Sequence, residues 1–112
     1  FCIGFEIDRE ELQNEIINSG MYSSFEPCIY PGVNIKYFIN QNNTNGICCC
    51  NSICNGKGDG LSDGNCKKIT IAVFKSGNII ITGGQNIDQL ETAYYFITRF
   101  INRQKEKFML HK

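Results

Sequence analysis

The chain has 112 residues, of which 42% are hydrophobic, and its 11 basic side chains balance 11 acidic ones. That length is typical of one domain with one core, so we expect residues 1–112 to form a single unit. No apolar run approaches the roughly 18 residues of a membrane helix, and no signal-peptide pattern is present, which argues against a membrane or secreted protein. Because the chain begins with Phe-Cys-Ile and not with Met, we expect it to be part of a longer protein.

Charge is distributed unevenly along the chain. Residues 1–35 carry six acids and one base, Arg9, whereas residues 36–112 carry ten bases and five acids. Such asymmetry permits a side of the molecule that faces an anion. Ordinary solvated surface charge accounts for the same pattern equally well.

The first third of the sequence predicts a strand, a helix and an interrupted strand. Apolar residues alternate over residues 1–7, which is the period of an amphipathic strand. Asp8 and Glu11 form a capping-box pattern and Gly20 stands where a C-terminal cap belongs, so we expect a helix over 9–19. Because proline has no backbone N–H, Pro31 cannot donate a hydrogen bond to a neighbouring strand and interrupts the next segment. A strand is expected after the Pro-Gly break, from 33 to 39.

Residues 67–85 predict a β-hairpin whose two faces differ. The segment Ser76-Gly77-Asn78 has turn chemistry, and a three-residue loop there places Phe74 opposite Ile80, with Thr82 on the same side. The opposite side then becomes a continuous aliphatic core face, formed by Ile69, Ile71, Val73, Ile79 and Ile81. A two-residue loop would mix the two faces, so we favour the loop of three.

The last part of the chain predicts a long amphipathic helix from residue 87 to at least residue 103. Asn86 and Gln89 resemble a second capping box, and the apolar residues that follow recur at helical spacing. The fold class is therefore α+β, with two helices on one face of an antiparallel sheet. The other face would expose Tyr30, Phe74 and Ile80, an apolar patch that needs a partner.

Residues 40–66 form a long insertion that is rich in Asn, Gly and Cys and has no periodicity. Five of the seven cysteines lie in or at the end of it: Cys48, Cys49, Cys50, Cys54 and Cys66. Four thiolates, from Cys48, Cys50, Cys54 and Cys66, would suit a zinc ion, although their spacing is not that of a standard C-x2-C pair. Disulfides and free thiols on an unstructured loop are the alternatives.

No catalytic residue set appears in the sequence. The Gly- and Asp-rich part of the insertion matches neither the phosphate-binding loop nor the EF-hand pattern. The one histidine, His111, has no sequence neighbour that would make it a general base. We therefore expect a binding protein and not an enzyme.

Two segments resemble motifs of the TATA-box-binding protein family. The segment SFEPCIYPGVNIKYF is similar to that family's YEP-x-x-FPG motif, and KKITIAVFKSGNIIITGGQ is similar to its LLIF-x-SGK-x-x-x-TGAK motif. The resemblance covers nearly the whole chain except 40–66 and corresponds to one lobe of a two-lobed saddle, most like the C-terminal lobe. With its Cys-rich insertion, the chain is also similar to TATA-binding-like factors of large nucleocytoplasmic DNA viruses of the mimivirus type.

The resemblance implies a curved sheet that lies on a widened DNA minor groove. TATA-binding proteins are themselves among the minor-groove binders for which apolar wedges that kink the duplex are established. By position, Tyr30 and Phe74 correspond to the two wedge aromatics and Thr82 to a threonine that contacts an A·T edge. The remaining correspondences are Thr70, Ala72 and Ile80 to apolar contacts with the groove floor, and Lys36 to an arginine that contacts phosphate.

The resemblance also implies partners and a place of action. These are A/T-rich double-stranded DNA, a second lobe in the same chain or a second copy, and proteins of the transcription machinery, in the nucleus or a viral factory. One rival hypothesis keeps the fold but loses DNA binding, so that the open sheet face or the cysteine loop docks a protein. Another is a zinc-binding structural domain in which the insertion is the functional part.

Overall fold

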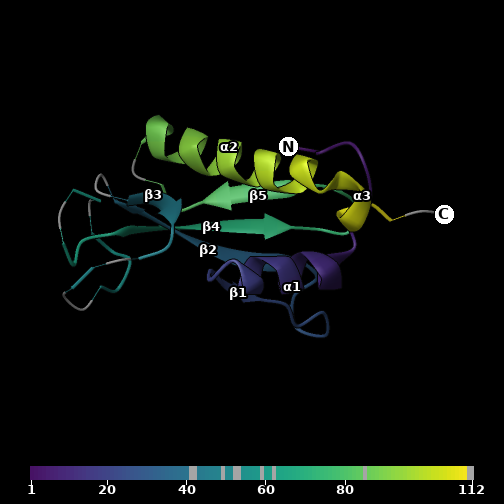
Figure 1. Ribbon diagram of the computed structural model, residues 1–112, viewed down its shortest axis with the longest axis horizontal. Coiled ribbons are helices and arrows are strands. Elements are labelled where there is room, and N and C mark those ends of the chain that lie inside the picture. Colours follow the sequence, from purple (N-terminus) through teal and green to yellow (C-terminus); the bar gives the residue numbers. More distant parts are fainter. Residues whose placement is uncertain are drawn as a thin grey trace.

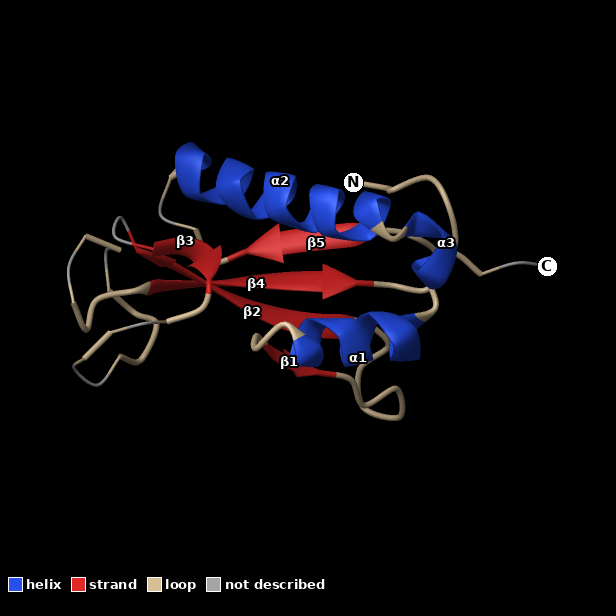
Figure 2. Ribbon diagram, viewed as in Figure 1, coloured by secondary structure: helices blue, strands red, loops and turns tan. Residues whose placement is uncertain are grey.

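The computed structural model describes residues 1–40, 43–48, 50–51, 54–58, 60–61, 63–84 and 86–110. An antiparallel sheet forms one layer and helices form the other (Figures 1 and 2). The elements in chain order are α1 (Arg9–Asn18), β1 (Tyr22–Ser24), β2 (Val33–Asn40), β3 (Asn43–Gly46), β4 (Lys67–Val73), β5 (Ile79–Thr82), α2 (Ile87–Arg103) and α3 (Lys105–Phe108).

The sheet has the spatial order β1-β2-β4-β5, and β3 pairs with the far end of β2. Every pairing is antiparallel. Helix α2 runs along β5 and β4, and α1 lies over the β2 side of the sheet (Figure 1). The predicted α+β class, with helices on one face of an antiparallel sheet, is confirmed.

Both long helices begin where their capping residues predicted. The Asp8 side chain accepts a hydrogen bond from the Glu11 N–H, and the Asn86 side chain accepts one from the Gln89 N–H. These bonds satisfy backbone donors that have no partner within the helix. Helix α1 ends at Asn18 with Ser19 as its C-cap, and Gly20 follows with a φ of +87° that a side chain would disfavour.

The β4–β5 hairpin has the predicted faces but a different register. Val73 pairs with Ile79 and Ala72 pairs with Ile80, so Phe74 is not opposite Ile80. Five residues separate the last strand pair, and the loop closes through a hydrogen bond from the Phe74 N–H to the Asn78 carbonyl (2.9 Å). Because this shift is two residues, each side chain keeps its predicted face.

The expected strand over residues 1–7 is wrong as a continuous element. Only isolated bridges form there, from Cys2 to Asn78 and from Ile7 to Met109. The Phe1 N-terminus also donates to the Ile79 carbonyl, at 2.9 Å. The segment therefore follows the β5 edge only over its first residues and then leaves it to reach α1.

The core lies between the helices and one face of the sheet. Its strand residues are the odd-numbered positions of β2, β4 and β5, and Ile35, Ile69, Ile71 and Val73 have no exposed surface. The helices contribute Leu12, Ile16, Ala93, Ile97, Ile101 and Phe108 to the same cluster. Within the described residues, no helix combines the length and hydrophobicity that crossing a membrane requires.

The insertion over residues 40–66 contains short paired segments, although its sequence has no periodicity. Its first part forms β3 on β2, and further on the Lys68 N–H donates to the Gly56 carbonyl (2.7 Å) and the Gly58 N–H to the Cys66 carbonyl (3.2 Å). Seven of its positions lie outside the described residues: 41, 42, 49, 52, 53, 59 and 62. The segments that are described attach the insertion to both β2 and β4.

Two isoleucines test the assignment of one face of the sheet to the core and the other face to solvent. Ile71→Ala should lower the free energy of unfolding by about 2–5 kcal/mol, because it leaves a cavity in a closed core. Ile80→Ala should change it by less than about 1 kcal/mol, because Ile80 on the other face is 51% exposed. Urea unfolding of both variants measures the difference, and equal losses would contradict the assignment of the two faces.

Candidate nucleic-acid interface and cysteine cluster

The face of the sheet away from the helices carries the even-numbered strand positions. Directly opposed residues in an antiparallel sheet share a face, so the register defines two adjacent rows. One row is Ser24, Asn34, Ala72 and Ile80, and the next is Tyr22, Lys36, Thr70 and Thr82. We call this the open face.

Two aromatic rings lie together at one end of the open face. The ring centroids of Tyr30 and Phe74 are 5.7 Å apart and their planes are tilted by 58°. Gly32 lies against both rings, because a Cβ built on it would come within 2.9 Å of the Tyr30 ring and 3.1 Å of the Phe74 ring. A side chain at position 32 would push the pair apart.

The loop that carries Tyr30 is fixed from α1. The Arg9 guanidinium donates to the Pro31 carbonyl at 2.7 Å and lies 4.9 Å from the centroid of the Phe25 ring. Within the loop, the Tyr30 N–H donates to the Glu26 carbonyl at 2.9 Å. Although Tyr30 belongs to no strand, these contacts hold its ring beside Phe74.

A lysine and two threonines form the middle of the open face. The Lys36 ammonium donates to the Thr70 hydroxyl at 3.3 Å, and Thr82 is the next residue in the same row. Partial burial, with a smaller repulsion from Lys68, lowers the pKa of Lys36 from its usual value. Two like charges close together favour a site for an anion.

The open face has no negative side chain on its described strands. At its even positions, β2 contributes Lys36 and β4 contributes Lys68, and the other members of these rows are uncharged. The acids of α1, among them Glu11 and Glu15, lie on the helical side and bind Lys107. The bases that follow residue 35 lie on both sides of the sheet, because Lys36 and Lys68 are on the open face whereas Arg99 and Arg103 belong to α2.

Sequence analysis missed a second aromatic pair on the open face. Tyr22 is 69% exposed, and its ring packs edge-on against Phe38 at a centroid distance of 6.2 Å. Phe38 alternates in phase with Lys36, so the strand period could have identified it. Tyr22 was harder to predict, because the side of the sheet on which it lies depends on its pairing with Lys36 across a turn that contains two prolines.

All seven residues predicted to contact DNA lie on or beside the open face. Ile80 is half exposed, whereas Ala72 is only 5% exposed because larger side chains surround it in its row. The structure therefore brings these residues together on one surface. Their roles in DNA binding stay predictions.

Four cysteines of the insertion converge into one cluster. The Sγ atoms of Cys48, Cys50, Cys54 and Cys66 all lie within 4.8 Å of one another. Cys66 Sγ is 3.4 Å from Cys50 Sγ and 3.8 Å from Cys48 Sγ. A metal–sulfur bond of about 2.3 Å places tetrahedral thiolates about 3.8 Å apart, so these four residues can hold a metal ion.

The surroundings of the cluster also suit a metal. The Cys66 N–H donates to Cys54 Sγ at 3.2 Å, and the Asn40 amide donates to Cys66 Sγ at 3.6 Å, which are contacts that stabilise thiolates. Burial, followed by hydrogen bonding with Cys50, raises the pKa of the Cys66 thiol, so a metal ion would have to displace its proton in order to bind. All four are free thiols, and the fifth cysteine of the insertion, Cys49, lies outside the described residues, as does His111.

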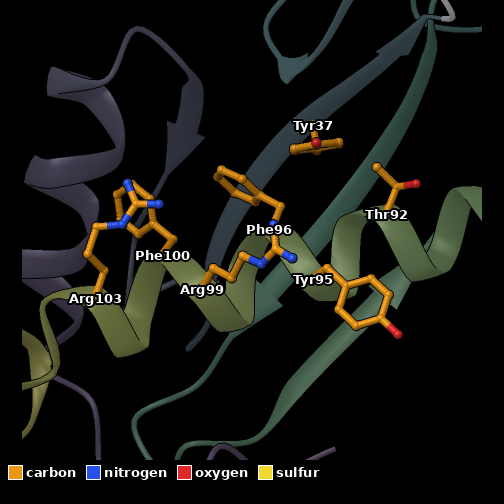
Figure 3. Close-up of a pocket in the computed structure, with 7 residues that line it drawn as sticks. All are labelled: Tyr37, Thr92, Tyr95, Phe96, Arg99, Phe100 and Arg103. Atoms are coloured by element: carbon orange, nitrogen blue, oxygen red, sulfur yellow. The ribbon is translucent and has the colours of Figure 1, made fainter.

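A pocket on the helical side was also missed. It has a volume of about 410 Å³ and is lined by Tyr37, Thr92, Tyr95, Phe96, Arg99, Phe100 and Arg103. Figure 3 shows the two arginines and the aromatic rings projecting from α2 around it, with Tyr37 reaching in from β2. The pocket is on the opposite side of the sheet from the open face, so it is a separate surface.

This arrangement defines a class of protein: an α+β lobe whose sheet is covered by helices on one side and presents aromatic, hydroxyl and lysine side chains on the other. A family model described as transcription factor TFIID, or TATA-binding protein, matches residues 1–104. The chain belongs to the TATA-binding protein family, and its fold is one lobe of that family.

A similar curated protein is a TATA-box-binding protein-like protein of Acanthamoeba polyphaga mimivirus, which is 41% identical over 49 residues. The match covers 44% of this chain and 13% of the viral protein, so the chain corresponds to a small part of that relative's length. No solved structure gives a significant match.

Proposed function

We propose that this chain is a DNA-binding lobe of a transcription initiation factor, and that its open face lies on the minor groove of an A·T-rich duplex. The observation that carries the proposal is the composition of this face. The open face carries a pair of aromatic rings together with lysines and threonines, and no acid lies among them on the described strands. Membership of the TATA-binding protein family supports the same function.

In this proposal Tyr30 and Phe74 act as the wedge. Their rings project together at the end of the sheet, where they can enter one base step and unstack it. Unstacking costs a few kcal/mol per step, which the larger contact with a bent duplex offsets. The Tyr30 hydroxyl needs a hydrogen-bond partner there, because a buried polar group without one is destabilising.

The rest of the open face supplies the groove contacts. The Thr82 hydroxyl can donate a hydrogen bond to the acceptors that A·T pairs present in the minor groove. Thr70, Ala72 and Ile80 give apolar contact with the groove floor. Lys36 contacts phosphate, which positions the duplex without reading its sequence.

The same proposal covers the setting of the lobe. It is a binding protein and not an enzyme, residues 1–112 form one lobe, and a second lobe in the same chain or a second copy completes the saddle. It acts with transcription proteins in the nucleus or a viral factory. The similarity to a mimivirus protein supports a viral setting.

One alternative function has a specific observation in its favour. The pocket on α2 combines aromatic rings, of which Tyr95 is exposed, with Arg99 and Arg103, a composition that suits an acidic protein segment. A lobe that bound only through this pocket would be a protein-interaction module. In that case substitutions on the open face would leave its interactions unchanged.

Phe74→Ala should weaken binding to an A·T-rich duplex by about 5- to 150-fold and reduce the preference over a G·C-rich duplex. The physical reason is that aromatic contact with a base contributes about 1–3 kcal/mol. A fluorescence titration of the protein with both duplexes, at two salt concentrations, measures the change. Tyr95→Ala is the matched control, because this exposed ring lies on α2.

Two results would contradict the wedge. If Phe74→Ala bound like the unsubstituted protein and affinity depended only on salt, the attraction would be a general one to phosphate. If Tyr95→Ala were the weaker binder, the helical side would be the interface.

We also propose that the cysteine cluster holds a zinc ion. Zinc prefers four thiolates in structural sites, and the sulfur separations of the cluster suit that geometry. The described part of the insertion contributes only Cys66 and Ile47 to the packed apolar interior. Zinc binding would supply folding free energy that hydrophobic burial supplies elsewhere.

Metal analysis of the purified protein should find about one zinc ion per chain. Cys54→Ser should lower that content substantially, because it removes one of four ligands. Cys28→Ser is the control, since Cys28 is an exposed thiol outside the cluster. A metal-free protein in which mass spectrometry finds a disulfide between two of the four cysteines would contradict the proposal.

A further inference from the structure

The insertion lengthens the sheet at the end opposite the Tyr30–Phe74 pair. Strand β3 pairs with β2 at Phe38 and Asn40, beyond Lys36, where the pairing with β1 ends. On the other side, residues 56–58 pair with 66–68, beyond the last β4–β5 pair at Thr70. The insertion thus continues the two outer positions of the sheet, those of β1 and β5.

This extension flanks a third row on the open face. Phe38 and Lys68 are opposed across β2 and β4 and lie on the same face as Lys36 and Thr70. The exposed ring of Tyr22 packs against Phe38. The row therefore offers an aromatic surface and a positive charge in line with the residues proposed to meet the minor groove.

Gly56 of the insertion lies directly against this row. A Cβ built on it would come within 2.6 Å of Lys68 Cβ and 3.1 Å of Phe38 Cε1, and its φ is +79°. Its carbonyl accepts the Lys68 N–H, so both its position and its conformation are set by the contact. Only a residue without a side chain allows this approach.

The cysteine cluster fixes the chain just before Gly56. Cys54 is two residues before it, and Cys54 Sγ accepts the N–H of Cys66, the residue directly before β4. In the described part of the chain, two backbone hydrogen bonds join the segment 56–58 to Lys68 of β4 and to Cys66 just before it, and each contributes only about 1 kcal/mol. Without a metal ion, few interactions would stabilise residues 56–58 in their position beside β4.

We infer that the insertion, when its cysteine cluster holds a metal ion, is part of the nucleic-acid-binding surface. In that state residues 54–58 hold Phe38 and Lys68 in position to contact the same duplex that the rest of the open face binds. This inference rests on the DNA-binding function and the metal site proposed above. The ligand is the phosphate backbone and groove wall of the duplex, because the charged strand residues of the open face are lysines.

The test compares duplex affinity and footprint length for zinc-loaded protein, chelator-treated protein and two variants. Cys54→Ser removes a ligand. Gly56→Ala keeps every cysteine but forces the segment away from Lys68, so it should retain zinc. Chelated protein, Cys54→Ser and Gly56→Ala should each bind about tenfold more weakly, a loss of about 1.4 kcal/mol, and protect a shorter stretch of duplex at one end.

Asn51→Ala is the control within the insertion, because it removes an exposed side chain while its N–H still donates to Asp63. It should bind zinc and DNA like the unsubstituted protein. Far-ultraviolet circular dichroism should show that all forms keep their helices, since α1 and α2 do not depend on the cluster.

Two outcomes would overturn the inference, and they are distinct. If zinc-loaded and chelated protein bind the duplex equally while Phe74→Ala weakens binding, the insertion takes no part and the DNA-binding function stands. If zinc-loaded, folded protein binds no duplex at all, the DNA-binding function fails and this inference fails with it.

Discussion

The structure depends on a strict separation of aliphatic and polar residues along three neighbouring strands. Odd positions of β2, β4 and β5 are almost entirely Ile and Val and pack on α1 and α2. Burying each such side chain contributes about 1.5–3 kcal/mol, and a register slip of one residue would expose them all. The same constraint fixes what the other face presents, so the packing of Ile35 and Ile71 determines where Lys36 and Ala72 lie.

A second constraint operates where hydrophobic burial is scarce. The insertion from Asn40 to Cys66 is held by short ladders to β2 and β4 and by the four-cysteine cluster between them. Cys66 is both a member of the cluster and the residue before β4, which joins the insertion directly to the sheet. A metal there would stabilise one end of the open face, whereas the aromatic pair at the other end is positioned by Arg9 and Gly32.

Local patterns in the sequence predicted much of this, because they report on local physics. Asp8 and Asn86 marked the helix starts, and the alternation along β4 and β5 separated Ile71 from Phe74. Features that depend on which residues pair with one another were missed or wrong. The register of the hairpin shifted by two residues, residues 1–7 made isolated bridges and not a strand, and the ladder at Gly56 required a fold of the insertion that no periodicity encodes. The sequence identified the four cysteines as candidate ligands, but it could not give the distances between their Sγ atoms.

The central claim is that the open face, and not the helical side, meets DNA. Ile80 and Ile81 are adjacent in β5 and point to opposite faces, so their methyl groups serve as paired reporters. The most direct measurement is a set of intermolecular nuclear Overhauser effects between isoleucine methyl groups and an A·T-rich duplex. The account predicts contacts from Ile80 to minor-groove protons and none from Ile71 or Ile81. The account would be contradicted if Ile80 showed no contact with the duplex and the chemical-shift changes on DNA binding occurred around Phe96 and Arg99.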